Sequence, residues 1–125
     1  MDERVRQALA NDRTIDITTI GRSSGLSHRI ETWFYRVDDR IYLTGSPGRR
    51  HWYANLLANP VFTFHLKQSV AADLPARATP VTDPEERRTI FERILSDLVR
   101  TQDLEAWLAG SPLMVVDFNG RDEES

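Results

Sequence analysis

A series of strand-like runs joined mostly by short turns constrains the fold of this chain most. The runs are rich in β-branched and aromatic residues or alternate in polarity, and they span 14–20, 28–37, 40–46, 61–67, 113–118 and, more weakly, 70–78. The pair Asp38-Asp39 is a two-residue hairpin candidate between the second and third runs. Because such hairpins join antiparallel neighbours, and because an antiparallel sheet with few helices must close or be covered, the pattern predicts a small β-barrel.

Helix signals place a few short helices outside this barrel. Asp2 caps an N-terminal helix within residues 1–12, and Asp83-Pro84-Glu85-Glu86 combines a cap, a helix-initiating proline and first-turn acids. Shorter helices are expected after Arg50 and over 103–109. We therefore expect an α+β, mainly β fold: a six-stranded antiparallel barrel with peripheral helices, forming one domain over 1–125 with a flexible acidic tail at 119–125.

The strand at 28–37 carries bulky side chains on both faces, so we expect it to be covered on both sides. Glu31 stands in the middle of this strand, and a buried carboxylate needs a partner. The nearby candidates are Arg29, Arg36 and Arg40. A structural ion pair is the favoured interpretation of Glu31, ahead of a catalytic role.

Composition excludes several classes of protein. The 125 residues include no cysteine, which excludes disulfides, thiolate metal sites and thiol catalysis. The sequence has no apolar run long enough to span a membrane, and the charged start Met1-Asp2-Glu3-Arg4 is unlike a signal peptide, so we expect a cytoplasmic protein. A net charge of −3 argues against a nucleic-acid partner, for which a basic footprint is expected.

Two cationic turns stand out as candidate anion sites. Gly21-Arg22-Ser23-Ser24-Gly25 brings turn amides, hydroxyls and a guanidinium together, and Gly48-Arg49-Arg50 leads into a helix start. Taken together, two such turns at the ends of strands could hold one extended anion, although either alone is weak evidence. Trp52 and Tyr53 follow the second turn and would give flat walls for a planar ring, unless they are core residues.

Other side chains give little sign of acid–base or metal chemistry. The three histidines have no spacing typical of metal ligands, although His28 and His51 flank arginines and could donate to an anion. Ser23, Ser24 and Ser46 lack the context of a nucleophilic serine. We therefore predict no catalytic side chain and no metal site.

An ordered set of motifs resembles the deazaflavin-dependent nitroreductase family of flavin-binding split β-barrels. The motifs are Thr18-Thr19-Ile20-Gly21-Arg22-Ser23-Ser24-Gly25, Arg29-Ile30-Glu31-Thr32-Trp33-Phe34, Leu43-Thr44-Gly45-Ser46-Pro47-Gly48, Trp52-Tyr53-Ala54-Asn55-Leu56-Leu57-Ala58-Asn59-Pro60 and Ala76-Arg77-Ala78. The resemblance runs over roughly 14–118. It implies a split barrel that binds coenzyme F-420, a deazaflavin with a phosphate and an oligoglutamate tail, and passes hydride from its reduced form to a small-molecule acceptor.

The resemblance also implies roles by position. The phosphate and tail would be held by Arg22, Ser24, Gly25 and Arg29, with Ser23 and His28 beside them; the deazaflavin would be lined by Thr44, Gly45, Ser46 and Gly48; the pocket would be closed by Trp52, Tyr53 and Asn55. Acceptors in the family include quinones, nitroaromatics and activated alkenes. A homodimer is the expectation by analogy.

Ser23 departs from the family pattern, because many members have Lys or Arg at this position. Arg49, Arg50 and His28 are the residues that could compensate. Two alternatives therefore stay open: an FMN-binding reductase of the same fold, and a non-catalytic protein that binds a flavin or another lipophilic ligand.

Overall fold

The computed structural model describes residues 1–118, and the tail expected at 119–125 lies outside the described residues. The elements follow in the order α1 (Glu3–Asn11), β1 (Thr14–Ile20), β2 (Ser27–Val37), β3 (Arg40–Thr44), α2 (His51–Ala58), β4 (Val61–Leu66), β5 (Ala72–Pro80), α3 (Pro84–Asp97), the 3-10 turn η1 (Thr101–Asp103), α4 (Leu104–Gly110) and β6 (Leu113–Phe118). No helix among residues 1–118 is long and apolar enough to cross a membrane.

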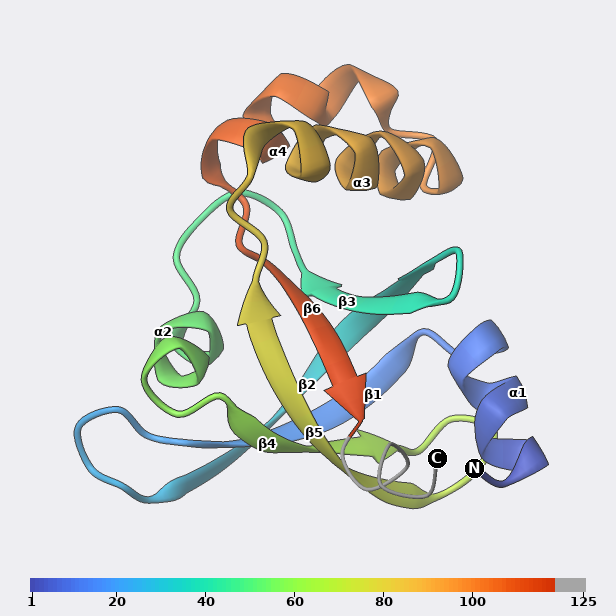
Figure 1. The fold of residues 1–125 in the computed structure, drawn as a ribbon, viewed down its shortest axis with the longest axis vertical. Helices are drawn as coiled ribbons and strands as arrows, with labels where there is room; N and C mark the ends of the chain where they lie inside the picture. The colour runs from blue at the N-terminus through green and yellow to red at the C-terminus, as the bar shows by residue number, and fades with distance from the viewer. Residues whose placement is uncertain (119–125) are drawn as a thin grey trace.

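The strands form a closed antiparallel barrel in the order β1-β2-β3-β6-β5-β4, which confirms the predicted fold class (Figure 1). The last strand, β6, closes it by pairing with β3 on one side, where Leu43 lies opposite Met114, and with β5 on the other, where Ala78 lies opposite Val116. The predicted hairpin at Asp38 is also confirmed, and Asp38 has the positive φ of 57° that a tight turn needs.

Aromatic rings fill the inside of the barrel. The ring of Phe64 on β4 meets Phe34 at 5.3 Å and Phe118 at 5.1 Å, both edge to face, and all three side chains are buried. Alternate residues of β1, Ile15 and Ile17, are fully buried beside them, as the period of two requires. The barrel interior is therefore a packed core.

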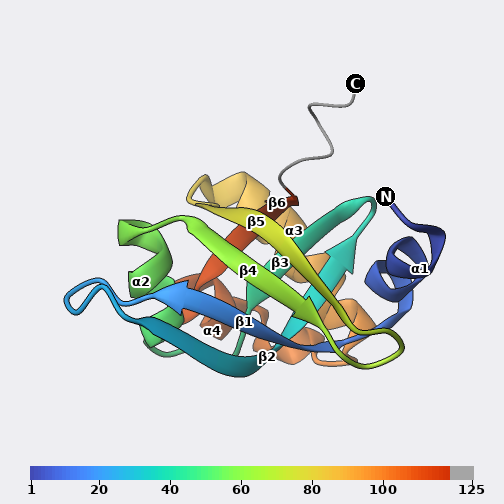
Figure 2. The same ribbon diagram turned by 90° about the horizontal axis from the view of Figure 1, so that it is seen from below.

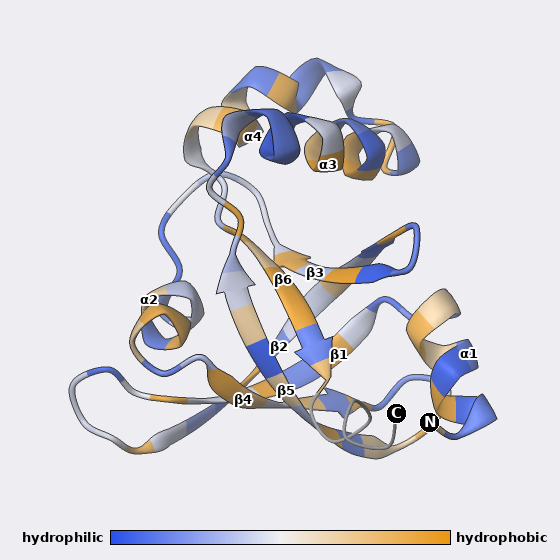
Figure 3. Cartoon of the chain, viewed as in Figure 1, coloured by the Kyte–Doolittle hydropathy of each residue, from blue (hydrophilic) through white to orange (hydrophobic). Residues whose placement is uncertain are grey.

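A second core lies between the barrel and the C-terminal helices. Tyr35 and Tyr42, on the outer face of the β2–β3 hairpin, pack beneath Phe91 of α3 and Trp107 of α4. The rings of Phe91 and Trp107 meet edge to face at 5.8 Å. Figure 3 shows the apolar side of α3 turned toward the barrel and its polar side turned away. These helices cover one end of β2 and leave the other uncovered.

The expectation that β2 is covered on both faces is wrong for its first half. Residues 27–31 are exposed, and β3 pairs with β2 only over 34–37. Glu31 is accordingly exposed, and its partner is Lys67, just after β4 and across β1 from β2, not an arginine. Lys67 also contacts Asp16 at 2.7 Å, and this contact with Lys67 is the main cause of a lowered Asp16 pKa.

Phe64→Ala should destabilise the protein by about 3–5 kcal/mol, because it removes a fully buried ring and leaves a cavity between Phe34 and Phe118. Chemical denaturation followed by fluorescence measures the change. Val61→Ala, on the exposed side of the same strand, is the control and should cost less than about 1 kcal/mol. Equal losses in the two variants would contradict the assignment of the core.

Candidate functional site

The β1–β2 turn and helix α2 are brought side by side at one end of the barrel (Figure 2). Asn55, a buried residue of α2, joins them: its side-chain oxygen accepts from the backbone N–H of Arg22 at 3.1 Å and from the Arg22 guanidinium at 2.9 Å. Its amide nitrogen donates to Thr19 at 3.4 Å. This clamp is the local reason that the first cationic turn keeps a fixed position relative to the second.

A cavity of about 450 Å³ lies between this turn, the start of β2 and α2, and we call it the hairpin cavity. Sequence analysis predicted six of its lining residues, namely Arg22, Ser23, Ser24, His28, Trp52 and Asn55. The wall is mostly polar or cationic on the turn side, and His51 lies 3.4 Å from the Arg22 guanidinium. The hairpin cavity therefore offers guanidinium, hydroxyl and imidazole groups to an anion.

Gly21 has to be glycine for this cavity to keep its shape. A Cβ at this position would come within 2.6 Å of Ser24 Oγ and 2.9 Å of His28 Nε2. Gly25, further along the turn, has a φ of 72°, which favours glycine for a different reason. Two of the predicted anion donors, Ser24 and His28, therefore lie close to the Gly21 backbone.

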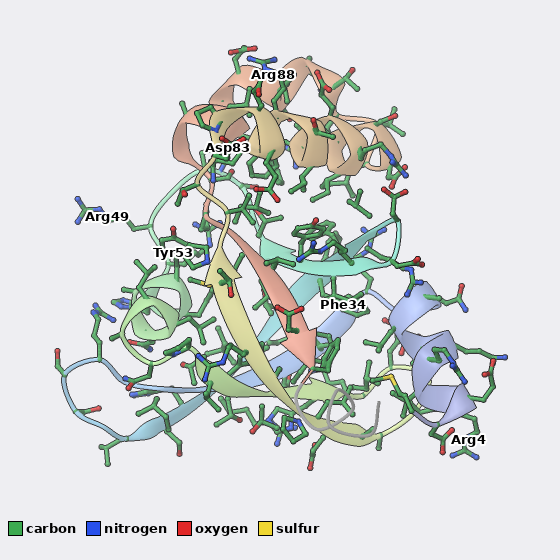
Figure 4. All side chains as sticks on the ribbon, in the orientation of Figure 1. Arg4, Phe34, Arg49, Tyr53, Asp83 and Arg88 are labelled. Carbon is green, nitrogen blue, oxygen red and sulfur yellow. The ribbon has the colours of Figure 1, made fainter. Side chains whose placement is uncertain are left out.

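The second cationic turn separates its two arginines. The Arg50 guanidinium folds back over the turn and donates to the carbonyl of Ser46 at 2.8 Å and to that of Arg49 at 3.3 Å. A Cβ on Gly45 would lie 3.1 Å from it. Arg49, in contrast, is exposed and points away from the barrel (Figure 4).

A second cavity of about 450 Å³ opens on the other side of Trp52, and we call it the aromatic cavity. It is lined by four further predicted residues, Thr44, Gly45, Ser46 and Arg50, and Trp52 lines both cavities. The Thr44 hydroxyl is buried and donates to the carbonyl of Pro112, so it holds the strand end in place. Gly48, Arg49 and Tyr53 line a third, adjoining hollow together with Arg50.

Two predicted site residues lie apart from these cavities. Arg29 points to the outer face of β2, opposite to His28, and its Nε donates to Asp16 at 3.0 Å. Gly25 lies at the exposed tip of the β1–β2 turn. Alternation along β2 explains the first case, because neighbouring side chains of a strand point to opposite faces.

Sequence analysis missed part of each wall. In the hairpin cavity it missed Thr19 and Ile30, and in the aromatic cavity it missed Thr32, Trp33, Tyr35, Leu98, Arg100 and Trp107. The bulk of Trp33 and Tyr35 on one face of β2 was a usable signal, since both lie on the face opposite Phe34. The residues of α4 and of the α3 end were out of reach, because only the tertiary fold brings them back to β2.

Two further groups bear on the chemistry. Burial raises the pKa of Tyr35, against the opposing effect of the Arg13 and Arg100 charges, so its phenol stays protonated and can donate. His65 lies outside both cavities, buried between Thr18 and Asp73 with 2.7 Å to each. Among residues 1–118 no cluster of three His, Asp or Glu residues is arranged to hold a metal ion.

The closed six-stranded antiparallel barrel, with two cavities that meet at Trp52, defines a split-barrel protein. The chain belongs to the family of F-420-H2-dependent quinone reductases, whose model matches residues 3–117. It is therefore an oxidoreductase that depends on coenzyme F-420, as the motif resemblance predicted.

Solved structures share the fold at low sequence identity. An F-420-H2-dependent reductase is 17% identical over 85% of this chain and 95% of that chain, with a TM-score of 0.63. A conserved hypothetical protein of Mycobacterium tuberculosis is 20% identical over 96% and 82%, with a TM-score of 0.64. A protein described as a domain-swapped dimer is 17% identical over 85% and 81%, with a TM-score of 0.61.

The residues present fit an anionic, ring-bearing cofactor such as F-420. Hydroxyls and a guanidinium converge on the hairpin cavity, which suits a phosphate, and Gly21 leaves room where a Cβ would collide with two of those donors. On the other side of Trp52, Gly45 and Ser46 line the aromatic cavity beside the rings of Trp33 and Tyr35, and such aromatic walls suit a flat ring.

Asn55→Ala should destabilise the protein by about 1–3 kcal/mol, because it leaves the Arg22 amide without its partner at a partly buried position. Denaturation measures the loss, and hydrogen exchange of the 21–26 amides should speed up. The matched control is Asn59→Ala, at the end of the same helix, where no side-chain hydrogen bond is formed among the described residues. The clamp is disproved if the two variants behave alike.

Proposed function

We propose that this protein transfers hydride from reduced F-420 to a quinone-like, nitroaromatic or activated-alkene acceptor. The observation that carries the proposal is the meeting of two cavities at Trp52: one is lined by the Arg22 turn with its hydroxyls, and the other by aromatic side chains together with Arg50 and Arg100. A cofactor with a charged tail and a neutral ring can span such a boundary, and an apolar acceptor can occupy what remains of the aromatic side.

In this proposal the hairpin cavity binds the phosphate and tail through Arg22, Ser23, Ser24 and His28. Arg22 is already oriented by Asn55, so little conformational freedom is lost when it binds an anion. Arg50 acts through the turn: its bonds to the Ser46 and Arg49 carbonyls hold the loop that would face the ring. Arg50 thereby supplies a positive charge that Ser23 lacks, and the exposed Arg49 lines a hollow together with Arg22 and Arg50.

When bound, the reduced deazaflavin supplies the hydride, so the chain itself has to provide orientation, charge and exclusion of water. Trp52 separates the two cavities, and Ser46 lies exposed at the edge of the aromatic cavity with its hydroxyl available. No acid–base side chain is assigned in this division of roles.

Arg22→Ala and Arg50→Ala should each weaken F-420 binding about tenfold or more. Arg22→Ala removes a charge-assisted contact to the anion, and Arg50→Ala removes the hydrogen bonds that hold the turn in place. Arg88→Ala is the control and should change the dissociation constant less than about twofold, because Arg88 pairs with Glu105 outside both cavities. Titration of tryptophan fluorescence with F-420 and with FMN gives the affinities. Unchanged affinity in the first two variants would remove both arginines from the site.

The same titration separates the alternatives. Micromolar binding of FMN without binding of F-420 would identify an FMN-dependent reductase of the same fold. Binding of F-420 without reduction of menadione or a nitroaromatic dye would favour a non-catalytic carrier. Neither outcome would change the barrel, because the fold rests on strand pairing and not on the ligand.

A homodimer is a further part of the proposal. The support is analogy with split barrels and the description of one similar fold as a domain-swapped dimer. The exposed outer face of β1 and β2 is a surface on which a second copy could pack. Light scattering of the purified chain should give about twice the 14.4 kDa of one copy; the mass of a monomer at all concentrations would refute it.

A further inference from the structure

The aromatic cavity carries positive charge that a neutral acceptor would not need. Arg50 and Arg100 both line it, and within residues 1–118 none of its lining residues is acidic. We propose that the aromatic cavity selects acceptors whose planar ring carries an anionic group, such as a carboxylate on a side chain, and that Arg100 recognises that group. The inference rests on the proposed function and narrows the class of acceptor within it.

Aromatic side chains form walls suited to the ring. The indole of Trp33 is 47% exposed although it lies on a strand, while Trp107 is buried at the base of the cavity. The Arg13 guanidinium lies 5.3 Å from the Trp33 ring and 5.4 Å from the Tyr35 ring, on the same sheet face. A third positive charge therefore stands next to this cavity, beside the exposed Trp33 and the buried Tyr35.

Arg100 keeps most of its hydrogen-bonding capacity. Its Nε donates to Asp103 at 2.8 Å, and the guanidinium lies 5.7 Å from the Trp107 ring. A guanidinium has five N–H groups, of which Arg100 uses the one on Nε for Asp103. The four on the terminal nitrogens form no hydrogen bond within residues 1–118. The side chain is 46% exposed, so an incoming anion can reach these groups.

The backbone holds Arg100 in this position at some cost. Helix α3 ends in a Schellman motif, in which the N–H of Arg100 bonds to the Leu95 carbonyl at 2.8 Å and that of Val99 to the Ser96 carbonyl at 3.1 Å. The left-handed position, usually glycine, is occupied by Val99 with a φ of 57°, which is strained for a β-branched residue. Val99 is 84% exposed, so the two Schellman hydrogen bonds, and not packing, hold it in this conformation and direct the chain into Arg100.

The charges also act on the cavity wall. The positive charges of Arg13 and Arg100 both lower the pKa of the Tyr35 phenol, although burial outweighs them. The two guanidinium groups are thus near enough to this lining residue to influence an anionic ligand beside it. Asp103, which pairs with Arg100 at 2.8 Å, opposes the effect by neutralising part of its charge.

A matched pair of acceptors tests the inference. The first is 2-methyl-1,4-naphthoquinone with a 3-propionate side chain, and the second is its primary amide, which has nearly the same shape. The saturated spacer keeps the ring chemistry alike in the two. With reduced F-420, the carboxylate should have a kcat/KM about three- to tenfold higher than the amide.

Three variants test whether Arg100 causes the expected preference for the carboxylate. Arg100→Gln should bring the ratio of carboxylate to amide close to one, whereas Asp103→Asn should raise it above the wild-type ratio, because it frees the Arg100 charge. A merely structural role would lower activity in both variants without moving the ratio in opposite directions. Arg88→Gln is the control and should leave the ratio unchanged, because Arg88 pairs with Glu105 outside this cavity.

A calorimetric arm without cofactor separates failure of this inference from failure of the proposed function. 2-Naphthylacetate should bind the chain more tightly than 2-naphthylacetamide, and Arg100→Gln should abolish the difference. Equal reduction of both quinones would overturn the inference and leave the proposed function intact. If neither quinone is reduced, the proposed function fails, and calorimetry then tests the inference alone. A preference for naphthylacetate that is lost in Arg100→Gln supports anion selection by the cavity. Equal binding of the two compounds overturns it.

Discussion

Closure of the barrel by β6 is the constraint on which the rest of the structure depends. The strand arrives late in the chain, after α3 and α4, and pairs with β3 and β5 at once. Without it, β3 and β5 would expose unpaired edges, and the aromatic core around Phe64 would open to water. Because β6 has to return to β3, the helices that precede it are carried back over β2, and Trp107 reaches the wall of the aromatic cavity.

The arginines around the site show how one residue type serves different physical roles. Arg22 is oriented by a buried amide, Arg50 binds carbonyls of its own turn, and Arg49 is exposed. Arg29 balances the charge of Asp16 on the opposite sheet face. Position in a strand or turn decides among these roles, because it sets which polar groups are within hydrogen-bonding distance.

Much of the fold could be read in advance because its signals are local. The hairpin at Asp38, the capped helix after Asp83 and the alternation of β1 each depend on neighbours within a few residues. The wrong expectation about β2 had a non-local cause: bulk on both faces suggested cover, but only the length of β3 and the place of α3 decide what covers it. The pairing of Glu31 with Lys67 likewise depends on how distant strands lie side by side, which the local sequence does not specify.

The sequence by itself determined the strand and turn types, the two cationic turns and the family, because these follow from φ/ψ preferences, side-chain period and ordered motifs. The tertiary structure alone decided which residues share a cavity. Arg22 and Asn55 are 33 positions apart, and Trp33 and Arg100 are further apart still. Strand register and barrel closure decide which residues become neighbours. Both depend on many weak contacts between residues far apart in the sequence, so no local sequence pattern predicts them.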